Sequence, residues 1–185
     1  MRSTNLLHGA RVRLAPPIAD DAPSIARWHA DAEFLRLFDA RPAYPQSEAE
    51  LGRWLEDRRR EEGTYFFAMR PLDGDELLGI VELDGIMWPH RHAWLSIAIG
   101  EARNRGRGYG ADALALILRF AFDELNLHRV QLSVFSYNQP AIALYEKLGF
   151  IREGAYREHL RRDGAWYDMY LYGMLRHEWE AARRL

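Results

Sequence analysis

The chain has 185 residues, of which 48% are hydrophobic and 28% charged, which is typical of one folded domain rather than of a disordered chain. Its formal net charge of −2 would attract neither nucleic acid nor an anionic membrane, so neither is an expected partner. The absence of cysteine excludes disulfides, thiolate metal sites and cysteine nucleophiles.

Targeting and membrane signals are not indicated. The first residues lack the apolar core and cleavage site of a secretory signal, and the longest apolar run, residues 113–118, is far too short to span a bilayer. We therefore expect a cytoplasmic protein with one domain over residues 1–185.

The first third of the chain predicts one strand and two helices. Apolar and polar residues alternate over residues 11–16, which predicts a strand ended by two prolines. The aspartates at residues 20–21 offer an N-cap to the first helix. Ser47 and Glu50 form a capping box before the second helix. The intervening residues 34–46 are aromatic and punctuated by proline, and no element is predicted there.

The middle of the chain predicts consecutive strands. Residues 64–70 and 76–86 are expected to form a hairpin with the Asp-Gly at residues 73–74 at its turn. A second turn, at residues 88–92, leads into a short apolar strand over residues 94–99. This turn carries a His-x-His pair without a third ligand nearby, so no metal site is expected.

A glycine-rich loop joins this strand to the next helix. Gly106, Gly108 and Gly110 alternate with bulkier residues, and glycines allow main-chain N–H groups to converge on one point. The start of the helix adds free N–H groups and a partial positive charge. Three arginines lie in the same stretch, so the loop predicts a cradle for a pyrophosphate.

Two other interpretations of this loop stay open. One is a surface loop with solvated arginines. The other is a dinucleotide-binding fingerprint, because Gly106, Gly108 and Ala111 satisfy G-x-G-x-x-G/A. That fingerprint normally opens the first βαβ unit of a fold with two halves, whereas this loop lies past the middle of the chain. The P-loop pattern is absent.

The remainder predicts a helix, a strand, a second helix and a hairpin. Residues 114–125 follow helical spacing, residues 129–136 predict a strand, and residues 139–149 predict a short helix with a glycine C-cap. Residues 150–162 and 165–179 predict a hairpin with an Asp-Gly turn. The predicted order is β-α-α-β-β-β-α-β-α-β-β, an α/β (α+β) fold whose mixed, mostly antiparallel sheet has about seven strands and helices on both faces.

Two motifs resemble the GCN5-related N-acetyltransferase (GNAT) superfamily. The cofactor loop of that family reads Gln/Arg-x-x-Gly-x-Gly/Ala, and its following helix reads N-x-x-A-x-x-x-Y-x-x-x-G-F. The matching residues here are Arg105, Gly108 and Gly110 in the loop, and Asn138, Ala141, Tyr145, Gly149 and Phe150 in the helix. The C-terminal part is similar to the RimJ/RimL-like branch, which acetylates the N-termini of ribosomal proteins.

The resemblance implies acetyl-CoA as the donor. Its pyrophosphate would lie on the main-chain amides of residues 105–110, and its pantetheine would run beside residues 97–99, in a gap where that strand splays from the next. Asn138 would hydrogen-bond the cofactor arm from just before its helix. The residues expected to bind the cofactor are Ile97, Ala98, Ile99, Arg105, Gly106, Arg107, Gly108, Tyr109, Gly110, Asn138, Ala141, Tyr145 and Lys147.

Tyr145 is the expected general acid. A thiolate must leave as the tetrahedral intermediate collapses, and a phenol with a pKa near 10 is a competent proton donor to it. The alternative is a packed helix aromatic. A backbone N–H of residues 97–99 is the candidate oxyanion donor. Without a cysteine nucleophile, transfer is expected to be direct.

The general base departs from the family pattern. Many relatives carry Ala-Glu-Ile at the start of this strand, where this chain has Ala-Trp-Leu at residues 93–95. Glu82, Asp84, His90 and His92 are candidate substitutes, and surface charge is the alternative for each. Deprotonating a lysine at pH 7 costs roughly 4.6 kcal/mol and an α-amine about 1.4. The missing base therefore favours an α-amine or another weakly basic nitrogen as the acceptor.

The acceptor pocket is expected between the first two helices and the hairpin around residues 157–166. Trp28, Phe34, Phe38 and Tyr44 are candidates to line it, with core packing as the alternative. A CoA-binding sensor without turnover and an acyltransferase for longer acyl groups remain alternatives. The acceptor, a peptide N-terminus or a small amine, and the oligomeric state, with a homodimer as one option, are left open.

Overall fold

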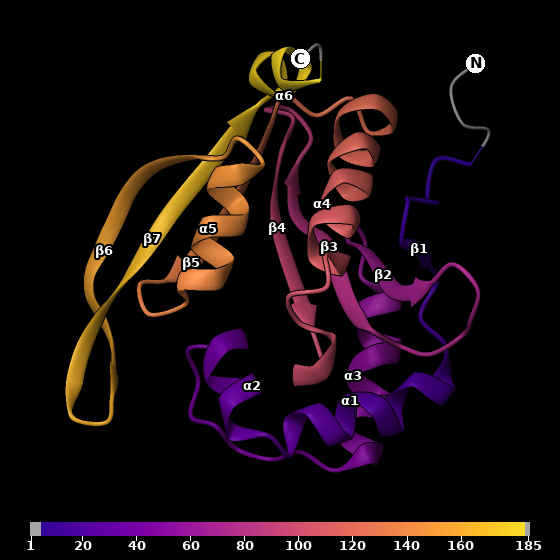
Figure 1. Cartoon of the computed structure of the whole chain (residues 1–185), viewed down its shortest axis with the longest axis vertical. Coiled ribbons are helices and arrows are strands. Elements are labelled where there is room, and N and C mark those ends of the chain that lie inside the picture. Colours follow the sequence, from indigo (N-terminus) through magenta and orange to yellow (C-terminus); the bar gives the residue numbers. More distant parts are fainter. Residues whose placement is uncertain (1–4, 184–185) are drawn as a thin grey trace.

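A seven-stranded sheet runs through the computed structural model, which describes residues 5–183 (Figure 1). The strands are β1 (Val12–Ala15), β2 (Tyr65–Pro71), β3 (Gly79–Met87), β4 (His92–Ile99), β5 (Arg129–Phe135), β6 (Ile151–Arg162) and β7 (Ala165–Leu175). Their order is β1-β2-β3-β4-β5-β7-β6, and only β4 and β5 pair in parallel. The predicted mixed, mostly antiparallel sheet is confirmed.

Helices cover both faces of this sheet. They are α1 (Ala22–His29), α2 (Ala32–Phe38), α3 (Glu48–Arg60), α4 (Tyr109–Arg119), α5 (Gln139–Lys147) and α6 (Arg176–Ala182). Two 3-10 turns (Ala19–Asp21 and Ala102–Asn104) and a π-helical segment (Phe120–Glu124) complete the elements. Within residues 5–183, no helix combines the length and apolar character needed to cross a bilayer.

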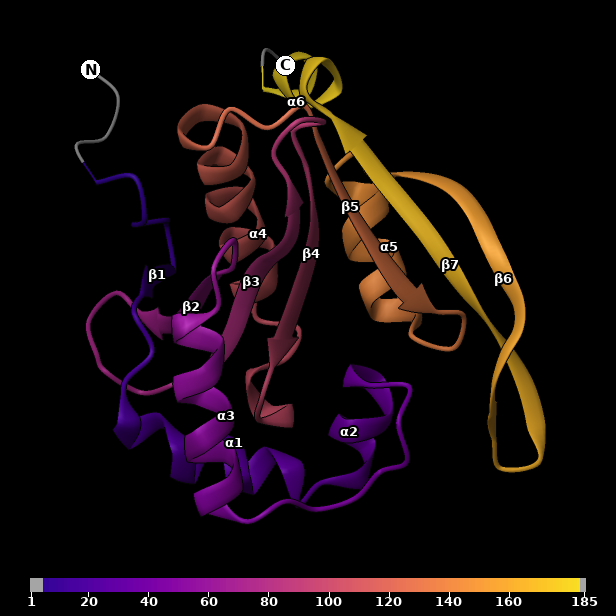
Figure 2. The ribbon, with the colours of Figure 1, turned by 180° about the vertical axis from the view of Figure 1, so that it is seen from behind.

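Two apolar cores, one on each face, hold the layers together. Leu114 and Ile117 of α4 pack with Val81 of β3 on the face that Figure 1 presents in front of the sheet. On the opposite face, seen in Figure 2, Leu51 of α3 packs with Ile80 of β3. The period-2 alternation of β3 thus divides its side chains between the two cores.

Two helices are absent from the predicted order. The helix α2 lies in the stretch for which no element was predicted, and the carboxylate of Asp31 caps it by accepting from the main-chain N–H of Glu33 at 2.9 Å. The helix α6 replaces the end of the predicted strand 165–179. There Trp179 turns inward to pack on Phe122, with ring centroids 5.0 Å apart, which a continuing strand would not allow.

Asp21 is the N-cap residue of α1, as predicted, but its side chain makes no capping hydrogen bond to this helix. Its carboxylate accepts from the main-chain N–H of Ile18 at 2.9 Å and caps the 3-10 turn. The same carboxylate pairs with Arg70 at 2.8 and 2.9 Å, and both side chains are buried. The aspartate therefore ties the first helix to β2.

The strands β2 and β3 form the predicted antiparallel hairpin, but its connection differs from the prediction. The strand β3 begins only at Gly79, so the connection is a longer loop. Arg13 donates to the carbonyl oxygen of Gly74 at 3.0 Å, and Arg70 donates to that of Asp75. Arg13 of β1 and Arg70 of β2 thus fix the position of this loop through its main-chain oxygens.

The capping box at the start of α3 is confirmed and gives a stability prediction. Ser47 Oγ accepts from the main-chain N–H of Glu50, and the Glu50 carboxylate accepts from that of Ser47 at 2.8 Å. Replacing Ser47 with alanine should lower the free energy of unfolding by about 1 kcal/mol and Tm by roughly 2–4 °C, measured by circular dichroism. The control Ser24→Ala, inside α1, should change stability by less than about 0.5 kcal/mol; equal losses in both variants would contradict the capping role.

Candidate active site

The parallel pair β4 and β5 separates part-way along its length. Pairing is confined to His92–Trp94 of β4 against Arg129–Gln131 of β5. Beyond Trp94 the two strands diverge, and β4 keeps hydrogen-bonded pairing only with β3. The main chain of the last β4 residues therefore presents N–H and C=O groups to the gap, where a ligand can pair with them as an added strand would.

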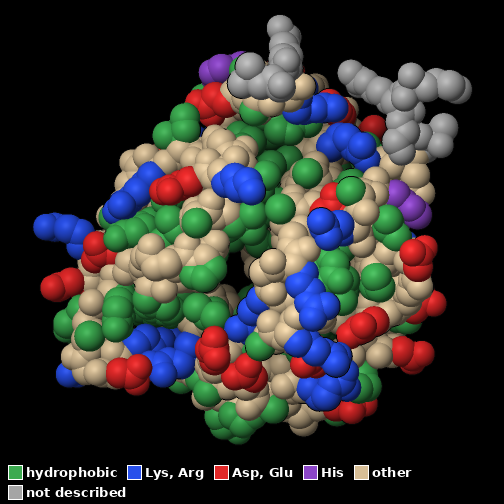
Figure 3. All heavy atoms as spheres, in the orientation of Figure 1, with side chains coloured by type: hydrophobic (Ala, Val, Ile, Leu, Met, Phe, Trp, Pro, Cys, Tyr) green, Lys and Arg blue, Asp and Glu red, His purple; other side chains and the backbone are tan. Residues whose placement is uncertain are grey.

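A cavity of about 720 Å³ occupies this gap. Figure 3 shows the surface hollowed at this place, between α5 and β4. Its walls are β4 from Trp94 to Ile99, the end of β5, the glycine loop, and one face each of α2, α4 and α5. The volume lies within the 300–1,000 Å³ range of cofactor and ligand sites.

The glycine loop forms one end of the cavity. Gly106 and Gly108 adopt φ values of 72° and 82°, a left-handed conformation that residues with a Cβ rarely adopt. Gly108 is the N-cap of α4, so the first N–H groups of that helix point out of its end beside the loop. This end of the cavity is suited to an anion.

The predicted cofactor residues meet at this cavity with one exception. Arg107 is exposed and lies outside the lining, although its neighbours are part of it. The predicted residues that do line the cavity are Ile97, Ala98, Ile99, Arg105, Gly106, Gly108, Tyr109, Gly110, Asn138, Ala141, Tyr145 and Lys147.

Two of these polar residues have partners within the protein. Arg105 donates to the carbonyl oxygen of Gly100 at 3.3 Å and pairs with Glu33 at 3.4 Å, which ties the glycine loop to α2. Asn138 caps α5, because its side-chain oxygen accepts from the main-chain N–H of Ala141 at 3.3 Å. Asn138 also lines the cavity, next to the start of α5.

Tyr145 lies on the cavity wall and is 7% exposed. Its ring packs against Phe150 and Tyr172, with centroids 5.9 and 6.4 Å away. Burial raises the pKa of Tyr145 to about 12. The phenol therefore carries its proton at neutral pH, as a general acid must, and it is a weaker acid than its usual pKa implies.

The helix α2 supplies another part of the cavity wall. Phe34 and Phe38 line the cavity as predicted, together with Leu37, Asp39 and Ala40. The other two predicted acceptor residues are not brought to it. Trp28 is 2% exposed and packs beneath Phe34, where its ring occupies the space beside Gly100, and Tyr44 is 72% exposed and outside the lining.

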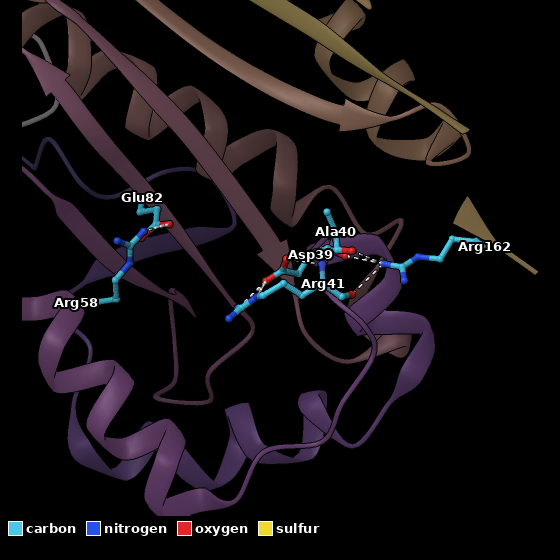
Figure 4. A network of polar contacts seen from close by, with 6 residues as sticks. All are labelled: Asp39, Ala40, Arg41, Arg58, Glu82 and Arg162. Carbon is cyan, nitrogen blue, oxygen red and sulfur yellow. Dashed lines mark hydrogen bonds and ion pairs between the residues drawn. The ribbon is translucent and has the colours of Figure 1, made fainter. Parts of the chain in front are cut away.

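The candidate bases separate into two groups. His90 and His92 stack on each other at the start of β4, and neither lines the cavity. Asp84 lines the cavity and pairs with Arg58 at 2.9 Å. Glu82 lies two residues before Asp84, on the same face of β3, and does not itself line the cavity. It pairs with Arg58 at 2.8 Å (Figure 4).

A residue that the sequence did not point to connects Glu82 to the cavity. Ser96 faces Glu82 across the strand pair, lines the cavity, and its hydroxyl donates to Glu82 Oε1 at 2.9 Å. The other oxygen of Glu82 is buried and has no hydrogen-bond partner within residues 5–183. Burial raises the pKa of Glu82, against the opposing effects of Arg58 and the Ser96 hydroxyl. In the sequence, the only sign of this link is the hydroxyl of Ser96 within the otherwise apolar residues 93–99.

Comparison with known proteins identifies the family. The model of the acetyltransferase (GNAT) domain matches residues 11–151. The chain belongs to the GNAT family of acetyltransferases. This confirms the resemblance found in the two motifs, and with it the fold and the enzyme class.

Relatives of this GNAT protein differ in their acceptors. An uncharacterized N-acetyltransferase of Bacillus subtilis, YokL, is 32% identical over 81% of this chain and 82% of its own length. The ribosomal protein uS5-alanine N-acetyltransferase of Escherichia coli is 25% identical over 88% of this chain and 87% of its own length. A crystal structure of Vibrio cholerae spermidine N-acetyltransferase with CoA and spermine has a TM-score of 0.82 at 25% identity, covering 91% of this chain and 98% of that one.

Proposed function

We propose that this GNAT enzyme acetylates an N-terminal α-amine of a peptide or protein by direct attack on acetyl-CoA in a ternary complex. The observation that carries the proposal is the Ser96–Glu82 pair, which reaches the cavity only through a hydroxyl. Although burial raises the pKa of Glu82, a carboxylate remains a much weaker base than a lysine amine, so it is suited to an acceptor amine that loses its proton easily. The named N-acetyltransferase relatives do not favour a CoA-binding sensor.

The residues around the gap fit acetyl-CoA. When bound, it supplies the thioester carbonyl that the amine attacks. The glycine loop and the start of α4 would hold the pyrophosphate through main-chain N–H groups. Arg107 does not line the cavity, so its guanidinium is not needed for this binding. The unpaired edge of β4 at residues 97–99 would bind the pantetheine arm and donate an N–H to the oxyanion.

Two side chains would move the protons. As the amine nitrogen bonds to the carbonyl carbon, Ser96 Oγ accepts the amine proton while passing its own to Glu82. As the carbon–sulfur bond breaks, Tyr145 donates its phenolic proton to the departing sulfur. The amine thus loses a proton through Ser96 and the thiol gains one from Tyr145, two groups on different walls of the cavity, and proton exchange with water returns Glu82 and Tyr145 to their starting states.

The acceptor class is tested with two peptides of the same length, one with a free α-amine and no lysine, the other N-terminally blocked with one lysine. At pH 7, kcat/KM measured by thiol release should favour the free α-amine by roughly a hundredfold, because the two amine pKa values differ by about 2.4 units. Equal values would contradict the proposal. A preference for spermidine over both peptides would assign this chain to the polyamine acceptors instead.

A further inference from the structure

The helix α2 lines the cavity and contacts two parts of the protein, α1 and the β6–β7 hairpin. Figures 1 and 2 show it between α1 on one side and the β6–β7 hairpin on the other. On the α1 side its contacts are aromatic: Phe34 packs on Trp28 and Phe38 on His29, with centroids 5.8 and 6.3 Å apart. Those contacts belong to the apolar core of that face.

On the hairpin side, polar contacts hold α2. Arg162, the last residue of β6, donates from Nη2 to the carbonyl oxygens of Asp39, Ala40 and Arg41 at 3.0, 3.2 and 3.0 Å. Figure 4 shows its side chain reaching from the strand to this segment. These carbonyls follow the last turn of α2, where a cation is favoured by the helix dipole.

Two further contacts join the same surfaces. Arg36 of α2 pairs with Asp163 at the hairpin turn at 2.5 Å. The hydroxyl of Tyr137, which follows β5, donates to the main-chain oxygen of Arg36. We call Arg162, Asp163 and Tyr137 with their α2 partners the clasp.

The clasp holds the part of the cavity wall that is formed by the end of α2. Phe38, Asp39 and Ala40 line the cavity, and two of these are the residues whose carbonyl oxygens Arg162 holds. Asp163 is 77% exposed, so water can replace its contact with Arg36 at little cost. The aromatic contacts with α1 would remain when the clasp opens, because they lie on the other side of the helix.

We propose that Arg162 and Asp163 are specificity-determining residues that keep α2 closed over the acceptor end, so that amines with a small neighbouring group are favoured over bulky ones. The inference rests on the proposed α-amine acceptor and adds the size of the acceptor to it. Arg162 acts through the position of α2 and does not itself touch the reacting atoms.

The first test compares glycinamide and tryptophanamide, which both present an α-amine and differ in bulk. In Arg162→Gln, the ratio of kcat/KM for tryptophanamide to that for glycinamide should rise about tenfold, the effect of losing hydrogen bonds to a charged group, while the KM for acetyl-CoA stays unchanged. Asp163→Asn should raise the ratio about threefold, because it removes one exposed pair. The control Arg161→Gln changes the neighbouring exposed arginine and should leave the ratio as in the wild type. An unchanged ratio in both clasp variants overturns the proposal.

A second measurement does not depend on turnover. Amide hydrogen exchange over residues 33–40 should be about tenfold faster in Arg162→Gln than in Arg161→Gln, with exchange in α4 unchanged. Equal exchange in the two variants overturns the clasp. Faster exchange in an enzyme that acetylates neither amide would instead uphold the clasp and reject the α-amine acceptor.

Discussion

Replacing Tyr145 with phenylalanine is expected to lower kcat by about a thousandfold, within the range for loss of a general acid, and to leave the KM for acetyl-CoA within about twofold. Phenylalanine keeps the ring that packs against Phe150 and removes only the hydroxyl. The assay is thiol release at saturating acetyl-CoA and amine.

The raised pKa of Tyr145 shapes this expectation. A phenol with a pKa of about 12 that gave its proton completely to a thiolate of pKa about 8.5 would do so uphill by about 5 kcal/mol. Donation must therefore accompany the breaking of the carbon–sulfur bond, when negative charge is forming on sulfur. Because the phenol stays protonated well above neutral pH, kcat should show no loss of this acid between pH 7 and pH 10.

Tyr172 is the matched control for this variant. It lies in the same aromatic cluster, and burial and the Glu146 carboxylate that accepts its hydrogen bond at 2.7 Å raise its pKa to about 12 as well. It does not line the cavity. Tyr172→Phe should keep kcat within about threefold, since it removes the hydrogen bond to Glu146 but keeps the ring and changes no group that lines the cavity. Equal losses in both variants would mean that Tyr145 is a packing residue.

Replacing Glu82 with glutamine is expected to lower kcat by about a hundredfold at pH 7, because glutamine cannot accept the proton that Ser96 passes on. The pH dependence follows from the direction of the pKa shift. Burial raises the pKa of Glu82, so the carboxyl becomes protonated, and the base is lost, at a higher pH than for an ordinary glutamate. The wild-type kcat should therefore fall as pH drops toward this raised pKa, and that acidic limb should disappear in Glu82→Gln.

Two further variants distinguish the relay from its neighbours. Ser96→Ala should lose about as much as Glu82→Gln, and the double variant should lose little more, because residues acting as a unit are not additive. Asp84→Asn removes another carboxylate from Arg58 and should change kcat by less than about threefold. A large loss in Asp84→Asn with full activity in Glu82→Gln would assign the base to Asp84.

The cofactor end of the site could be predicted from the sequence because its signals are local. Glycines that need a left-handed φ, a helix start and an N-cap asparagine act within a few residues of one another, and the structure has Gly106, Gly108 and Asn138 in those conformations or roles. The gap was expected from the family resemblance, and the confinement of β4–β5 pairing to residues 92–94 and 129–131 agrees with it.

The proposed acceptor end, at α2, could not be predicted in the same way because tertiary contacts form it. The helix α2 has seven residues, too few for a clear periodic pattern, and Arg162 stabilises its end from far along the chain. Trp28 and Phe34 looked equivalent as aromatic residues, yet Trp28 packs beneath and Phe34 lines the cavity. The link between Glu82 and Ser96 depends on the register of β3 and β4, which an irregularity between Asp84 and Met87 shifts and which counting residues from the turn would therefore misplace.

A crystal structure of the protein soaked with CoA tests the central claim most directly. We expect the diphosphate within hydrogen-bond distance of the main-chain N–H groups of residues 106–110, the pantetheine arm beside residues 97–99, and the sulfur near the Tyr145 hydroxyl. A diphosphate bound elsewhere, or a gap between β4 and β5 closed by side chains, would contradict the assignment of this cavity to the acetyl donor.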